Sequence, residues 1–171
     1  DTIIVVNNAL EILNEKDLYH YQSAIPAVNY GINTSLNYKK WTASMAFHGS
    51  VGNYMYNNVF SNRGVMTTIL NPLEYLSNGS PNVLQTNFNG TQLLSDYYIQ
   101  NATFFRMDNL NVGYNFGKIG KGIANLNLTA NVQNVFVITD YKGLDPEINN
   151  GIDNNFYPRP RTFTLAVAVD F

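Results

Sequence analysis

Apolar and polar residues alternate at the end of the chain, as they do in a β-strand with two different faces. Within residues 157–171, small or polar residues occupy one face and large apolar residues occupy the other. The apolar positions are Phe163, Leu165, Val167, Val169 and Phe171. In a soluble sheet this face meets a core, whereas in a transmembrane barrel it faces lipid while the polar face lines the lumen.

Four earlier segments show the same alternation and predict two hairpins. Residues 27–38 and 41–51 are separated by a two-residue Lys-Lys turn. Residues 104–116 and 124–136 are separated by a glycine-rich stretch at 117–122, which we expect to be the second turn. With the closing segment, the pattern predicts five antiparallel strands.

The polar faces of these strands consist mainly of Asn, Thr, Ser and Gly. A soluble sheet normally exposes Lys and Glu on its solvent side, but only 13% of this chain is charged, about half of the usual share. We therefore predict a water-filled lumen beside this face. The representative lumen-facing positions are Asn33, His48, Asn111 and Asn131.

Two charged residues interrupt the apolar face of the third strand. Arg106 and Asp108 have the same parity as Leu110, so an unbroken strand would point them toward lipid. Either they reach the headgroup region or a β-bulge near Met107 switches the register. Structural anchoring is the favoured role of Arg106.

Short and long connections alternate along the chain, as in barrels with short periplasmic turns and long extracellular loops. We expect extracellular loops at 52–101 and 137–156, and the remainder of another such loop at 1–26. Residues 27–171 then contain the strands and their loops. Because five strands leave two open edges in hydrocarbon, we expect them to be one end of a larger barrel, its other strands preceding residue 1.

Two other architectures are compatible with parts of the pattern. One is a self-contained eight-stranded barrel, an adhesin or structural protein, which needs three more strands from 1–26 and 52–101. Neither region has a sustained alternation. The other is a soluble carbohydrate-binding β-sandwich.

Composition narrows the function classes. The net charge of −2 and the absence of a basic cluster interleaved with aromatics argue against nucleic-acid binding. The chain has no cysteine, and neither His20 nor His48 lies beside a nucleophile motif, so we predict no enzymatic activity, cofactor or metal. Four acidic residues fall in one connection, but without the spacing of a calcium loop we expect them to be solvated: Asp140, Asp145, Glu147 and Asp153.

An ordered set of motifs resembles the C-terminal portion of the SusC/RagA family of TonB-dependent outer-membrane transporters of Bacteroidetes. The motifs span nearly the whole chain. They are YGINTSLNYK (30–39), GNYMYN (52–57), ATFFRMDNLNVGY (102–114), NVQNVF (131–136), DYKGLDPE (140–147) and YPRPRTF (157–163) followed by the closing strand.

The resemblance implies a barrel of about 22 strands with an N-terminal plug, located in the outer membrane and surrounded by its lipid. It also implies active import of oligosaccharides or peptides, a SusD-like lipoprotein partner and a TonB complex that contacts the missing N-terminal part. By the same resemblance, Phe171 is the aromatic end used in barrel assembly. The closing strand is then expected to pair with the missing first strand.

Four tyrosines in or beside the longest loop are candidate contacts for a ligand or for the lipoprotein lid. They are Tyr54, Tyr56, Tyr97 and Tyr98. Their rings offer flat faces for stacking on sugars or peptide side chains. The alternative is that they pack the loop against itself.

Overall fold

The computed structural model describes residues 3–5, 18–70, 78–120, 124–154 and 157–170. The chain divides into two compact units. The strand unit comprises Val28–Ser50, Phe104–Thr139 and Arg159–Phe171. The loop unit comprises Asp1–Ala27, Val51–Thr103 and Asp140–Pro158.

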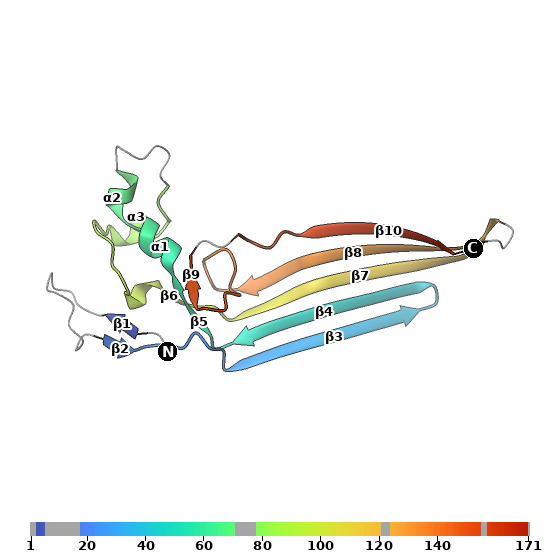
Figure 1. Cartoon of the computed structure of the whole chain (residues 1–171), viewed down its shortest axis with the longest axis horizontal. Coiled ribbons are helices and arrows are strands. Elements are labelled where there is room, and N and C mark those ends of the chain that lie inside the picture. The colour runs from blue at the N-terminus through green and yellow to red at the C-terminus, as the bar shows by residue number, and fades with distance from the viewer. Residues whose placement is uncertain (1–2, 6–17, 71–77, 121–123, 155–156, 171) are drawn as a thin grey trace. The chain divides into compact units, whose positions relative to one another are not determined.

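The strand unit is one five-stranded sheet in the order β10-β8-β7-β4-β3, drawn side by side in Figure 1. Its strands are β3 (Val28–Tyr38), β4 (Trp41–Val51), β7 (Phe104–Ile119), β8 (Ala124–Thr139) and β10 (Thr162–Asp170). Strands β4, β7, β8 and β10 pair antiparallel, and the two-residue connection makes β3 and β4 a hairpin. The five predicted strands are confirmed, and β3 and β10 are the open edges.

The predicted second turn is wrong in its position, because β7 continues to Ile119. Gly117 adopts φ +80°, and its N–H donates to Oδ1 of Asn115 at 2.7 Å. The register between β7 and β8 shifts at this point. Glycine, which accepts positive φ without strain, therefore forms a β-bulge inside the strand instead of reversing it.

The β-bulge expected near Met107 is confirmed. Met107 pairs with Phe47 and Asn109 pairs with Ala46, so Asp108 is the extra residue on β7. One inserted residue moves every preceding side chain to the other face. Arg106 consequently pairs with His48 on the polar face instead of pointing toward the apolar side.

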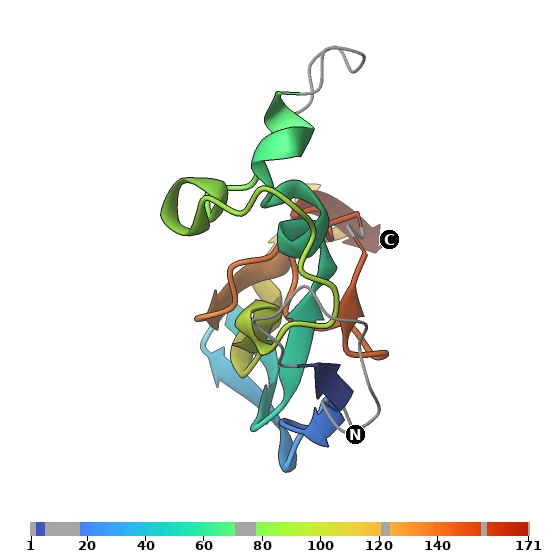
Figure 2. The same ribbon diagram turned by 90° about the vertical axis from the view of Figure 1, so that its left-hand side faces the viewer.

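The loop unit holds short elements. Its two small sheets, ordered β1-β2 and β6-β5-β9, are separate from the five-stranded sheet. The elements are β1 (Ile3–Val5), β2 (Leu18–His20), β5 (Tyr54–Asn57), α1 (Asn58–Arg63), α2 (Met66–Ile69), α3 (Val83–Thr86), η2 (Asp96–Tyr98), β6 (Ile99–Asn101) and β9 (Ile152–Asp153). Figure 2 shows the helices of this unit, in green to yellow-green, from a second direction. None of the described helices is long and apolar enough to cross a bilayer.

A buried apolar cluster and a helix cap stabilise the loop unit. Met55, Ala102 and Tyr141 form its buried cluster. Asn57 caps α1, its Oδ1 accepting from the N–H of Phe60 at 3.0 Å.

The two alternative architectures, a self-contained eight-stranded barrel and a β-sandwich, find no support. The short strands of the loop unit do not extend the five-stranded sheet, and the described part of the strand unit holds a single sheet rather than a sandwich.

Candidate functional site

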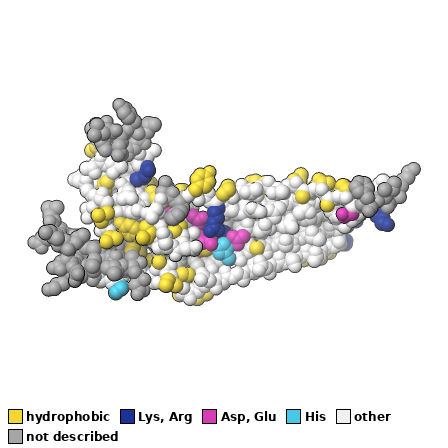
Figure 3. Space-filling model, viewed as in Figure 1, with side chains coloured by type: hydrophobic (Ala, Val, Ile, Leu, Met, Phe, Trp, Pro, Cys, Tyr) yellow, Lys and Arg dark blue, Asp and Glu magenta, His cyan; other side chains and the backbone are white. Residues whose placement is uncertain are grey.

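The polar face of the strand unit is lined mainly by uncharged side chains. Strand pairing places Ser44, Asn111, Asn131 and Thr164 in one row across four strands. Nδ2 of Asn131 donates to Oδ1 of Asn109 at 3.1 Å. In Figure 3 the sheet surface toward the viewer carries few charged or apolar side chains along most of its length.

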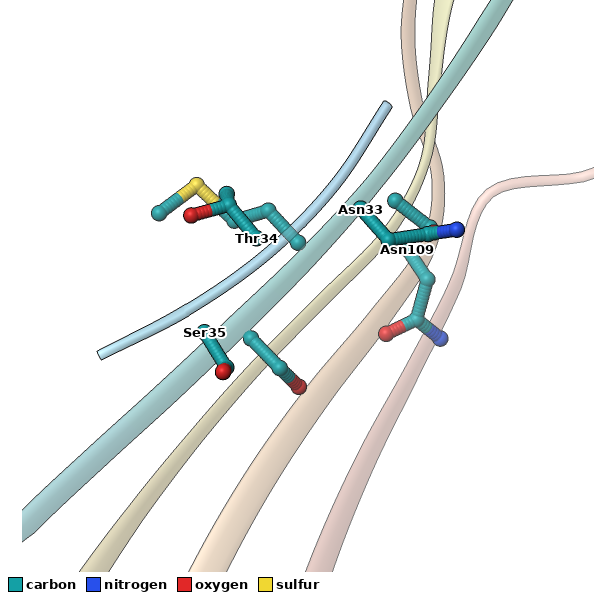
Figure 4. Close-up of a pocket in the computed structure, with 7 residues that line it drawn as sticks. Asn33, Thr34, Ser35 and Asn109 are labelled. Atoms are coloured by element: carbon teal, nitrogen blue, oxygen red, sulfur yellow. The ribbon is translucent and has the colours of Figure 1, made fainter. Parts of the chain in front are cut away.

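Asn33 lies on the same face, near the β3 edge. It borders a shallow hollow of about 330 Å³ together with Ser35 and Asn109. Figure 4 shows these three side chains on one side of the sheet and Thr34 on the other. The structure thus places the predicted positions Asn33, Asn111 and Asn131 on one polar face. That this face lines a lumen stays a prediction.

A charged cluster interrupts this polar face at the β7 bulge. Nδ1 of His48 donates to Oδ2 of Asp108 at 2.5 Å. Nη1 of Arg106 donates to Oδ1 of Asn134 at 2.9 Å, and the guanidinium lies 5.7 Å from the centre of the Phe104 ring. These contacts give each charged side chain of the cluster a partner. Histidine, acidic and basic side chains lie close together in Figure 3.

Asn134 connects the cluster to the segment before β10. It adopts φ 51°, a left-handed conformation that asparagine tolerates better than most residues. Its Nδ2 donates to the carbonyl of Arg159 at 2.7 Å, and its own carbonyl accepts from Nε of Arg161 at 3.2 Å. In the sequence, the bulge beside this cluster is signalled because the apolar residues change from odd to even positions between Met107 and Leu110. Nothing in the alternation of β8 singles out Asn134.

The apolar face carries two groups of aromatic rings. At the loop end, Phe105 stacks with Phe47 at 5.5 Å and Tyr30 at 6.4 Å, and its centre lies 6.2 Å from that of Phe136. We call these four residues the loop-end belt. They join β3, β4, β7 and β8 across the sheet.

The turn-end belt lies beside the Lys39–Lys40 connection. It consists of Tyr38, Trp41, Tyr114 and Phe116, in which the Trp41–Tyr114 and Tyr114–Phe116 ring centres are each 4.7 Å apart. Tyr30 and Tyr38 are eight residues apart on β3, about 27 Å of strand, or about 21 Å of height at a tilt of ~40°. Two belts at this spacing match the aromatic girdles that flank the lipid-facing band of an outer-membrane barrel.

The closing strand β10 presents Phe163, Leu165, Val167 and Val169 on this apolar face, and all four are exposed. They pair with Val132, Ala130, Leu128 and Leu126 of β8. Because β10 is an edge strand, its other side is open for a further strand. Phe171 lies outside the described residues.

The four candidate tyrosines differ in accessibility. Tyr98 has no exposed surface and Tyr56 is only 9% exposed, with ring centres 5.9 Å apart, so the structure contradicts their prediction as surface contacts. Apolar burial explains the difference, because loops of this length form a small core of their own. Tyr97 is 43% exposed and Tyr54 is half-buried, which leaves Tyr97 as the most accessible ring.

Tyr98 and Tyr56 lead to a matched prediction about stability and pH. Oη of Tyr56 donates to Oγ of Ser61 at 2.8 Å, whereas within the described residues Oη of Tyr98 has no hydrogen-bond partner. We expect Tyr56→Phe to destabilise the loop unit by about 1 kcal/mol and Tyr98→Phe to be neutral or stabilising. Limited proteolysis of the full-length protein measures both.

The ionisation of Tyr98 contributes to the expected loss of stability at alkaline pH. Burial raises the pKa of Tyr98 to about 12, and the neighbouring Tyr56 adds to the rise. A raised pKa in the folded state means that the stability is complete below about pH 10 and is lost as pH rises from about 10 toward 12. Tyr98→Phe should therefore shift the alkaline loss of protease resistance to higher pH, and an unchanged profile would contradict this.

A cleft of about 570 Å³ opens in the loop unit. Its lining combines aromatic, amide and charged side chains from α1, α3, η2, β6 and the segment after β8, among them Phe60, Gln85, Tyr97, Gln100, Asp140 and Lys142. The volume lies within the range of about 300–1,000 Å³ that is usual for ligand pockets. Of these residues the alternation pattern singled out only Tyr97, because the others come together only through folding.

The acidic residues of 137–156 do not form a joint site. Oδ2 of Asp153 accepts from Oη of Tyr141 at 2.7 Å, Oδ1 of Asp145 accepts from the N–H of Glu147 at 2.9 Å, and Asp140 borders the cleft. Across the described ranges, no three His, Asp or Glu side chains are grouped so that they could hold a metal ion.

Comparisons with known proteins agree with this geometry. The whole chain aligns at 35% identity with the TonB-dependent receptor SusC of Bacteroides thetaiotaomicron, of which it covers 18%. Over 85% of its length it is 28% identical to the TonB-dependent receptor P3 of Formosa agariphila, covering 16% of that protein. The chain thus spans less than a fifth of these curated relatives. No protein-family model matches it.

The fold also matches solved structures. The RagAB peptide importer in its open-open state superposes with a TM-score of 0.71, at 19% identity, over 98% of this chain and 20% of that one. The closed-closed state gives a TM-score of 0.70. At this identity the likeness establishes the fold.

Proposed function

We infer that this chain, which belongs to the SusC/RagA type of TonB-dependent outer-membrane receptors, forms barrel wall and outer loops of an active importer. The observation that carries the proposal is the 35% identity to SusC across the whole chain. The strand unit supports it physically, since a single sheet with an exposed apolar face and two aromatic belts suits a wall between lipid and lumen.

The proposed cargo is an oligosaccharide or a peptide, and the proposed partners are a SusD-like lipoprotein over the loops and the TonB complex. In this proposal Asn33, His48, Asn111 and Asn131 line the lumen. The exposed face of β10 contacts lipid, and its open edge pairs with the first strand of the barrel. The chain's contribution is binding and passage, without catalysis.

Uptake measurements test the proposal. We expect cells with the full-length receptor to import fluorescent oligosaccharides or peptides, and deletion of the receptor gene or of TonB to reduce uptake of the cargo to the level of cells that lack both. Cells with an unrelated TonB-dependent receptor deleted provide the control. Uptake that survives the loss of both the receptor and TonB would refute the proposal.

A further inference from the structure

The cleft of the loop unit has a lining with balanced charge. Asp140 and Lys142 are exposed and, within the described part of the chain, neither side chain has an ion-pair or hydrogen-bond partner. One acid and one base give the lining no net charge, so it favours neither an anionic nor a cationic ligand. Both groups are available to hydrogen-bond a neutral polar molecule.

Amide side chains supply further donors and acceptors. Gln85, on α3, and Gln100, on β6, both border the cleft. Each amide offers an acceptor oxygen and two N–H donors, which match a pair of adjacent hydroxyl groups. The Gln100 amide is held in place, since its Oε1 accepts from the N–H of Lys142 at 3.2 Å.

One aromatic ring presents a rigid apolar surface at the same cleft. Tyr97 is 43% exposed, and it packs edge-on against Phe88 and Tyr98, with ring centres 5.8 and 5.1 Å away. A ring fixed by its neighbours loses little conformational entropy on binding. It suits the flat C–H face of a pyranose, whose rim carries hydroxyl groups for the amides.

We propose that this cleft binds pyranose units of a neutral oligosaccharide, which rests on the importer function proposed above and specifies its cargo. Tyr97 stacks on the sugar, while Gln85, Asp140 and Lys142 bind its hydroxyls. An extended peptide fits less well: β6, the sheet edge at the cleft, is only three residues long and offers few main-chain groups for strand addition.

Calorimetric titration of the full-length receptor tests the site. The probes are neutral hexasaccharides of glucose, mannose and galactose, with neutral octapeptides as the competing class. We expect a hexasaccharide to bind the unaltered receptor, Gln85→Ala to weaken binding about fivefold, and Tyr97→Ala to weaken it about tenfold. Tyr97→Phe and Gln92→Ala, an exposed glutamine outside the cleft, should stay within about twofold.

Gln85 is exposed, so its variant tests the cleft even where Tyr97→Ala disturbs folding. Hexasaccharide binding that is equal in all variants overturns the cleft assignment, while TonB-dependent uptake would still support the importer. Octapeptide binding that falls in the cleft variants overturns the sugar assignment. The sugar assignment is also overturned if the unaltered receptor binds none of the hexasaccharides. The importer function itself is refuted only if uptake depends on neither the receptor nor TonB.

Discussion

Leu165→Arg on β10 should prevent most of the receptor from reaching its folded state. Leu165 is exposed on the apolar face, in one pairing row with Ala130 and Val112, between the two aromatic belts. If this face contacts lipid, an arginine near the middle of the bilayer costs about 2–4 kcal/mol. The measurement is the fraction of full-length receptor with heat-modifiable gel migration, followed by urea unfolding in lipid vesicles.

Thr164→Arg is the matched control, because Thr164 is the adjacent residue of the same edge strand and is also exposed. It projects to the polar face, in the row of Asn131 and Asn111. An arginine there remains in water, so we expect a change within about 1 kcal/mol. Equal tolerance of both substitutions would show that the apolar face does not contact lipid.

The sheet was predictable from the sequence because each strand alternates for many residues. The period of two determines which side chains share a face, and the low charge of the polar face indicates a lumen rather than bulk solvent. The turn between β3 and β4 was also predictable from its length. These features depend on local sequence, which a single chain contains in full.

Features that depend on contacts between distant segments were less accessible. Gly117 signalled a turn, but its bulge depends on pairing with β8. Tyr97 and Tyr98 are adjacent in sequence, yet Tyr98 is buried and Tyr97 is 43% exposed. The packing of the whole loop unit determines which of the two rings is accessible. The cleft is lined by residues from 60 to 142, which no local pattern connects.

Deleting Met107 should have the second large effect, because it removes one residue of β7 next to the bulge and brings a charged side chain to the apolar face. Met107 pairs with Phe47 on that face; with Asp108 still bulged, Arg106 would take this place and Phe105 would turn to the polar face. The loop-end belt would lose three ring contacts, each worth about 0.5–1.5 kcal/mol. We therefore expect a loss of about 3 kcal/mol or more in unfolding free energy in vesicles.

Asp108→Ala is the control, because it leaves the number of residues in β7 unchanged. This variant keeps the bulge and removes only the contact with His48, which is partly exposed, so the expected cost is about 1 kcal/mol or less. The deletion should therefore abolish heat-modifiable migration, whereas the alanine variant preserves it. If the two variants were equally stable, the distribution of side chains between the two faces of β7 would not matter for stability, and the role given to the bulge would be wrong.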